Sequence, residues 1–120
     1  MKALPVRLIY GQGYEPCGAD EATHVTLHIP GPTGRLTLPV ILRGAREGTG
    51  CWSWNGSTEA PTLRPSVLTT SHEGWRCHSW INDGRAQFLD DCSHQFRGQT
   101  VALLDVDATS ITRLIKGKNQ

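Results

Sequence analysis

The side chains able to do chemistry gather in the second half of the chain. They are Ser66, Cys77, His78, Asp90, Asp91, Cys92 and His94. Serine, histidine and aspartate are the groups of a nucleophilic site, in which the imidazole takes the hydroxyl proton and the carboxylate orients the imidazole. Cysteine and histidine are zinc ligands. One short segment therefore supports two chemical interpretations.

Which of these groups face one another depends on an expected hairpin. Asp83-Gly84 is a dipeptide that favours a two-residue type I′ turn between strands 76–82 and 85–89. Such a turn places Asn82 opposite Arg85, and every further pair follows by counting outward along the two strands.

Because side chains alternate between the faces of a strand, the count sorts the candidates into two groups. His78 and Asp91 fall on one face, and Cys77 and Cys92 fall on the other. Neighbouring residues Cys77 and His78 are therefore not expected to bind one metal ion, and the hairpin predicts two separate sites.

On the first face, Asp91 lies diagonally from His78, where a carboxylate fixes the tautomer of an imidazole. Ser66 precedes this strand and would supply the nucleophile. It shares the face of His78 if the loop centred near Glu73 has three or five residues, and not if the loop has two or four. The alternative is a serine in a turn after Pro65 and a surface histidine, and the sequence leaves both open.

On the second face, Cys77 and Cys92 lie diagonally at about 7 Å, with His94 beside them if the strand continues. These are candidate zinc ligands, and Cys17 or Cys51 would be the fourth. The spacing matches no standard zinc motif, and no CxxC pair is present. The alternative is that both cysteines are small buried side chains and that His94 caps a turn.

The elements that must position these groups are short strands. Alternation of polar and apolar residues, punctuated by Gly and Pro, predicts strands at 24–29, 35–38, 51–54, 62–70 with an interruption at Pro65, 76–82, 85–89 and 100–106. Helical signal is confined to 107–115. We expect a single domain over 1–120 that is mostly β: a small antiparallel sandwich or partly open barrel of short strands, with at most one short C-terminal helix.

Composition excludes several classes of protein. The 120 residues carry 12 Lys and Arg against 11 Asp and Glu, which leaves no basic footprint for duplex nucleic acid. No apolar stretch approaches the length of a membrane span, and the N-terminal residues lack the apolar region of a secretory signal. The expected location is the cytoplasm, where four cysteines seldom form disulfides.

Four tryptophans and several arginines suggest a binding alternative. Tryptophans usually belong to the core, but together they can wall a pocket that stacks a ring while arginines pair with phosphates. The side chains concerned are Trp52, Trp54, Trp75, Trp80, Arg64, Arg76, Arg85 and Arg97.

The order of motifs along the chain resembles a known family. The motifs are Trp52-Ser53-Trp54-Asn55-Gly56, Arg64-Pro65-Ser66, Cys77-His78, Asp83-Gly84 and Asp90-Asp91-Cys92-Ser93-His94. Over residues 51–104 they resemble a small family encoded largely by phages and prophages. Its members are often labelled ammonia monooxygenase, a label that does not fit a sequence without a membrane span.

The Pro-Ser and Cys-His elements are also similar to a predicted peptidase of bacterial ubiquitin-like conjugation operons. That resemblance implies a serine nucleophile and reaches Ser66 and His78. It also implies a cysteine-rich knuckle near the N-terminus, of which this chain keeps only Pro16-Cys17-Gly18.

Two functional hypotheses follow. The first is a phage-encoded hydrolase or peptidase-like domain in the host cytoplasm, with Ser66 as nucleophile, His78 as base and Asp91 as the group that orients it. The second is a non-catalytic counter-defence protein that sequesters a protein or small-molecule partner in the host cell. A structural zinc ion at Cys77, Cys92 and His94 is compatible with either.

Overall fold

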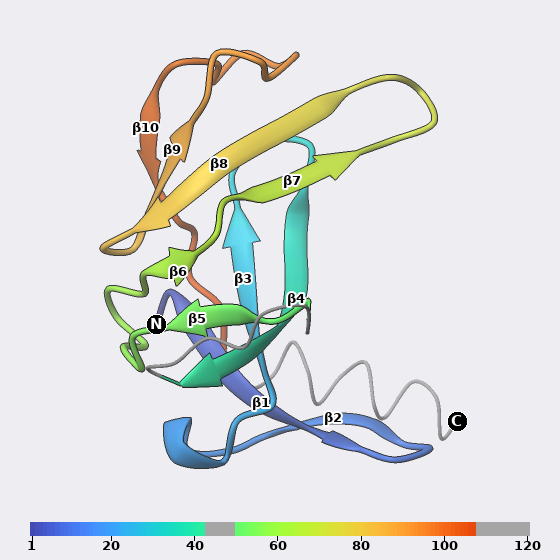
Figure 1. Ribbon diagram of the computed structural model, residues 1–120, viewed down its shortest axis with the longest axis vertical. Coiled ribbons are helices and arrows are strands. Elements are labelled where there is room, and N and C mark those ends of the chain that lie inside the picture. The colour runs from blue at the N-terminus through green and yellow to red at the C-terminus, as the bar shows by residue number, and fades with distance from the viewer. Residues whose placement is uncertain (43–49, 108–120) are drawn as a thin grey trace.

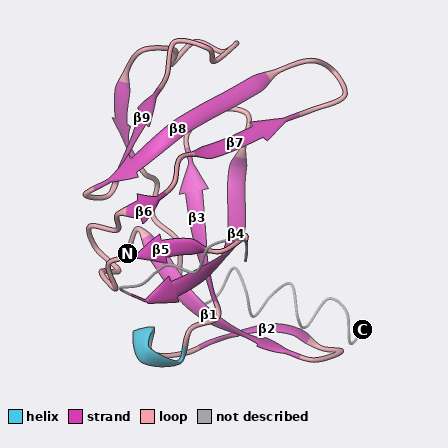
Figure 2. Ribbon diagram, viewed as in Figure 1, coloured by secondary structure: helices cyan, strands magenta, loops and turns pink. Residues whose placement is uncertain are grey.

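The computed structural model describes residues 1–42 and 50–107, and its regular secondary structure consists almost entirely of strands joined by loops (Figures 1 and 2). The strands are β1 (Ala3–Ile9), β2 (Gly13–Pro16), β3 (His24–Ile29), β4 (Gly34–Leu42), β5 (Trp52–Trp54), β6 (Leu63–Arg64), β7 (Val67–Thr70), β8 (Arg76–Asn82), β9 (Arg85–Phe88) and β10 (Thr100–Ala102). A single 3-10 turn, η1 (Ala19–Glu21), lies between β2 and β3. No helix of the described residues is long and apolar enough to cross a membrane.

The strands form two sheets. The larger has the order β2-β1-β3-β4-β5-β6, and the smaller has the order β10-β9-β8-β7. Neighbouring strands are antiparallel except β4 and β5, which are parallel. Both sheets are open over the described part of the chain, so the expectation of a mostly β fold is confirmed as a pair of sheets and not as a closed barrel.

The core lies between the two sheets, where apolar side chains from both are fully buried. It includes Leu27 and Ile29 from β3, Trp54 from β5, Ile81 from β8 and Phe88 from β9. In β8 the burial alternates strictly: Cys77, Ser79 and Ile81 are buried, while the residues between them are partly exposed. The smaller sheet therefore has an outer face that no other sheet covers, and the even-numbered residues of β8 lie on it.

Pro65 divides the strand expected over 62–70 into two strands that belong to different sheets. Leu63 and Arg64 pair with β5 in the larger sheet, and after the cis Arg64–Pro65 bond the chain enters β7 of the smaller one. A proline has no N–H for a ladder bond, so this is a natural place for pairing to end. The break leaves Ser66 in the short link between β6 and β7, where the chain passes from one sheet to the other. Figure 1 shows this passage from β6 to β7.

Other elements differ from expectation at the ends of the chain. Strands β1 and β2 have no counterpart among the expected strands, and the last strand is shorter than 100–106, with Leu104 forming only an isolated bridge to His28. The helix expected over 107–115 lies outside the described residues except for Asp107.

Candidate functional site

The β8–β9 hairpin has the register that its turn dipeptide predicts. Asp83 and Gly84 both have positive φ, 49° and 75°, and Asn82 lies opposite Arg85. Glycine adopts this conformation at no steric cost, and aspartate tolerates it better than most residues. The turn therefore fixes which side chains of β8 and β9 share the outer face.

The β7–β8 connection decides where Ser66 lies. Thr70 is opposite Arg76, which leaves a loop of five residues, 71–75. A loop with an odd number of residues is the case in which Ser66 and His78 share a face. Because Leu68 is opposite His78, Ser66 lies diagonally from the imidazole, two residues before Leu68 and just ahead of β7.

The structure brings Ser66, His78 and Asp91 into a hydrogen-bonded row on the outer face. Ser66 Oγ lies 2.9 Å from His78 Nε2. On the other side of the ring, His78 Nδ1 lies 3.0 Å from Asp91 Oδ2 and 3.2 Å from Oδ1. With a proton on Nδ1 donated to the carboxylate, Nε2 is left to accept the serine proton, which is the arrangement that activates a hydroxyl.

Asp91 reaches His78 from a turn and not from a strand, because β9 ends at Phe88. The turn is fastened to β8 by backbone hydrogen bonds: Leu89 N–H donates to His78 O at 2.9 Å, and Ser93 N–H donates to Arg76 O at 2.9 Å. Because these hydrogen bonds hold the turn in place, the Asp91 carboxylate keeps its orientation although Asp91 is not paired in a strand.

Arg76 forms a further link in the row. Its Nε lies 3.1 Å from Asp91 Oδ2, the oxygen that also meets His78. The hydrogen bond from His78 is the largest cause that holds the pKa of Asp91 below its usual 3.8. The hydrogen bond and the charge of Arg76 lower this pKa further. Asp91 is therefore a carboxylate at neutral pH, able to accept both contacts.

The surface around Ser66 combines apolar and cationic side chains. Trp52 donates its indole N–H to Ser66 O at 3.3 Å. The guanidinium of Arg64 lies over the Trp80 ring, 5.1 Å from its centroid, and Leu68 is 48% exposed. Ser66 is itself partly exposed, so the row is accessible from solvent.

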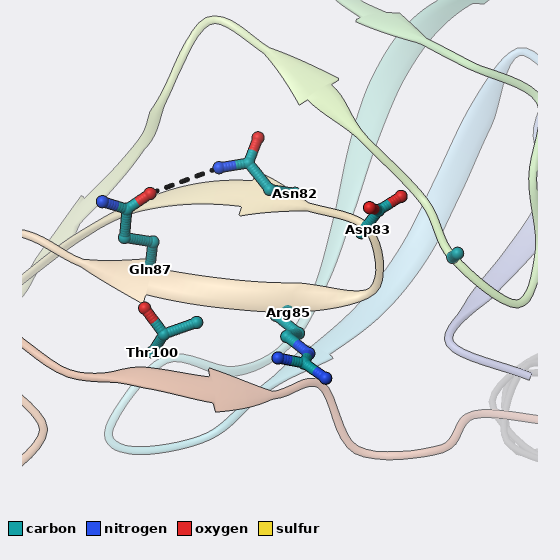
Figure 3. A pocket seen from close by; sticks show the side chains of 6 residues that line it. Asn82, Asp83, Arg85, Gln87 and Thr100 are labelled. Atoms are coloured by element: carbon teal, nitrogen blue, oxygen red, sulfur yellow. Dashed lines mark hydrogen bonds between the residues drawn. The ribbon is translucent and has the colours of Figure 1, made fainter.

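A shallow hollow of about 680 Å³ lies farther along the same face, beside the β8–β9 turn (Figure 3). It is lined by Ala60, Asn82, Asp83, Arg85, Gln87 and Thr100. Across it Asn82 donates to Gln87 Oε1 at 3.3 Å. Gln87 is opposite Trp80 in the ladder, so Trp80 stands between the hollow and Ser66.

The tryptophans and arginines of the binding hypothesis do not share one pocket. Trp54 is fully buried in the core, whereas Trp52, Trp75 and Trp80 are partly exposed. Arg64 contacts Trp80, Arg76 contacts Asp91, and Arg85 lines the hollow.

The candidate zinc ligands Cys77, Cys92 and His94 each contact different neighbours. Cys92 Sγ lies 3.2 Å from His78 N and 3.1 Å from His78 O, and Cys77 is buried beneath the sheet. The His94 ring packs edge-on against Phe88, and its Nδ1 accepts the Phe96 N–H at 3.2 Å.

No group of three or more Cys, His, Asp or Glu side chains within residues 1–42 and 50–107 is arranged to hold a metal ion. Zinc at Cys77, Cys92 and His94 stays a prediction. The contact between Cys92 and the His78 backbone was not predicted from the sequence. Assigning the two residues to opposite faces gives no indication of this contact, because Cys92 Sγ meets the backbone of His78 and not its side chain.

Comparison with known proteins gives one match. A family model described as bacterial ubiquitination-like system serine protease (BubE) matches residues 16–89. No curated protein and no solved structure matches the chain. The matched range includes Ser66 and His78 and ends two residues before Asp91.

Proposed function

This chain belongs to the family of bacterial ubiquitination-like system serine proteases (BubE), and from that premise we propose that it cleaves an amide bond of a polypeptide with Ser66 as the nucleophile. The family supports a peptidase-like function. The assignment of individual groups rests on one observation, the continuous row of contacts from Ser66 Oγ through the His78 ring to Asp91.

Each group of the row has a role that its position permits. Ser66 Oγ attacks the carbonyl carbon while His78 Nε2 takes the hydroxyl proton, and the resulting imidazolium is stabilised by the Asp91 carboxylate. Collapse of the tetrahedral intermediate breaks the C–N bond, and His78 passes its proton to the leaving amine. The acyl group is then an ester on Ser66.

The second half of the reaction uses the same groups in reverse. A water molecule gives a proton to His78 Nε2 and attacks the ester carbonyl. The C–O bond to Ser66 breaks, the serine recovers its proton, and a carboxylic acid leaves. Only the amide and one water molecule are consumed, and Ser66, His78 and Asp91 are regenerated, so the cycle balances.

Labelling with a fluorophosphonate tests the proposal, because this reagent phosphonylates a serine hydroxyl that a neighbouring base has activated. We expect one adduct per chain by intact-mass spectrometry, located on Ser66 by peptide mapping. Ser66→Ala should abolish it, and His78→Ala should slow it at least about 100-fold.

Ser71→Ala is the matched control. Ser71 Oγ accepts the Glu73 N–H at 3.2 Å and makes no hydrogen bond to a histidine ring within the described residues, so its loss should leave the labelling rate unchanged. An unlabelled wild-type protein, or a Ser66→Ala variant labelled at the wild-type rate, would overturn the assignment.

A further inference from the structure

The open edge of β7 begins one residue after the proposed nucleophile. β7 is the last strand of its sheet, with β8 on one side and no other described strand on the other. Ser66 immediately precedes Val67, the first residue of β7. An edge strand presents unpaired backbone N–H and C=O groups, and these can pair with another extended chain.

The contacts of β8 show which backbone groups of β7 point away from the β7–β8 ladder. His78 O accepts the Leu89 N–H from the far side, so the backbone of His78 points toward β9. Leu68 is opposite His78 and is therefore at a non-hydrogen-bonded position of the β7–β8 ladder. The N–H and C=O of Leu68 point away from β8, and those of Thr70, two residues on, do the same.

The sequence of β7 does not protect this edge. Proteins usually shield edge strands with charges, proline or very short length. The other edges of the described sheets have such features: β2 contains Glu15 and Pro16, β6 has two residues, and β10 has three. β7, by contrast, is Val-Leu-Thr-Thr, with neither charge nor proline.

We propose that the open edge of β7 binds the substrate polypeptide as an added antiparallel strand. The residues on the acyl side of the cleaved bond lie along Leu68 and Thr70. This inference rests on the proposed function and names how the substrate is held. An antiparallel chain runs from Thr70 toward Ser66, so it delivers its carbonyl to the nucleophile, and antiparallel pairing is the more stable arrangement.

The occupant is a polypeptide in extended conformation because its backbone matches the edge. Along an extended chain, the N–H and C=O groups that point to one side recur every two residues, about 7 Å apart. The outward-pointing groups of Leu68 and Thr70 have the same spacing. The half-exposed Leu68 side chain lies on the outer face beside His78, where it can contact a substrate side chain on the same side as the row.

Two inhibitors test the edge separately from the nucleophile. One is an alanine diphenyl phosphonate, which reacts with an activated serine and has no residues to pair, and the other is its tetra-alanyl counterpart. We expect the tetrapeptide to inactivate the wild-type protein at least about tenfold faster. N-methylation of the tetrapeptide should remove this advantage at alternate positions only, because successive N–H groups of a strand point to opposite sides.

Leu68→Pro removes one N–H from the open edge and no hydrogen bond from the β7–β8 ladder. Edge strands tolerate proline at a position whose N–H points away from the sheet. This variant should abolish the advantage of the tetrapeptide, measured as the ratio of the two inactivation rates in the same variant. Leu68→Thr is the matched control, because it also removes the leucine side chain but keeps the N–H, and it should retain most of the advantage that Leu68→Pro loses.

The outcomes separate the two proposals. If neither phosphonate nor the fluorophosphonate modifies Ser66, the proposed function is wrong. If Ser66 reacts but the tetrapeptide has no advantage, or its advantage is unaffected at every N-methylated position, the edge inference is wrong and the nucleophile assignment stands. The N-methylated series uses the wild-type protein, so the test holds even if Leu68→Pro does not fold.

Discussion

His78 and Asp91 meet at 3.0 Å although only His78 belongs to a strand. The carboxylate comes from the turn that follows β9, and that turn is fixed by bonds from Leu89 to His78 and from Ser93 to Arg76. The backbone of His78 thus helps to position the carboxylate that contacts its own side chain. Disturbing the turn should therefore affect the row without any change to Ser66 or His78.

Asp91→Asn tests the carboxylate itself. An amide of the same shape can no longer stabilise an imidazolium and can hold the ring in the wrong tautomer, so the rate of Ser66 labelling by a fluorophosphonate should fall roughly 10³- to 10⁴-fold. Asp90→Asn is the control, because the neighbouring carboxylate makes no hydrogen bond to His78 in the structure. Equal rates for the two variants would contradict a role for Asp91.

Arg76→Gln should change the ionisation of the Asp91 carboxyl group more than the stability of the fold. Arg76 is one of the groups that lower the pKa of Asp91, so its removal should raise that pKa toward 3.8, as measured by carbon-13 NMR titration of the carboxyl group. The stability that a depressed carboxyl pKa contributes is present above the ordinary value and is lost as pH falls through the folded value. The variant should lose it at a higher pH than the wild type.

The control for this titration is Arg97→Gln, which removes an exposed charge of the same sign elsewhere. Because Arg76 and Asp91 are both nearly half exposed, the ion pair itself contributes little to stability. An unchanged Asp91 titration in Arg76→Gln would show that the contact is absent in solution.

Much of this site follows from local sequence. Asp83-Gly84 determines a two-residue turn, and from it the register of β8 and β9 and the face of His78 could be counted. The structure places Asp91 beside His78 as that count implies, although the strand ends at Phe88 and a turn supplies the last residues. The roles of these groups in catalysis stay a prediction.

The position of Ser66 could not be decided in the same way. It depends on whether the loop after Thr70 has an odd or even number of residues, and alternation alone does not say where a strand ends. β1 was missed for a related reason: Ala3, Leu4, Pro5 and Val6 are all buried, so the strand lacks a two-residue period. Pairing across long distances, such as the parallel β4–β5 contact, leaves no local signal.

Gly84→Ala should destabilise the hairpin that sets the register. A Cβ at Gly84 would lie 3.0 Å from the backbone oxygen of Glu59, at a φ of 75° that side chains rarely adopt. We expect a loss of about 2 to 3 kcal/mol in the free energy of unfolding, measured by urea denaturation. Gly74 also has a positive φ, but a Cβ built there meets no other residue within 4 Å. Gly74→Ala should therefore lower the free energy of unfolding by only about 1 kcal/mol. Equal losses would mean that the Glu59 contact relaxes at no cost.

Cys77 should make the fold less stable at alkaline pH. Burial raises the pKa of its thiol above the ordinary 9.0, an effect partly offset by the hydroxyls of Thr33 and Thr69. A group whose pKa is higher in the folded state stabilises the fold fully below its unfolded pKa, and this contribution is lost as pH rises through the folded value. Above pH 9 the unfolding free energy should therefore fall by up to about 1.4 kcal/mol per pH unit from this thiol.

Urea denaturation from pH 8 to pH 11 measures the effect as the difference between the wild type and Cys77→Ala. The variant is less stable at pH 8 because it lacks a buried sulfur, but the gap between the two proteins should narrow as pH rises. Cys51→Ala, which removes a thiol that is only partly buried, serves as the control for the loss of one cysteine. A gap that stays constant across this range would show that the Cys77 thiol ionises at the same pH in the folded and unfolded chains, and the burial argument would be wrong.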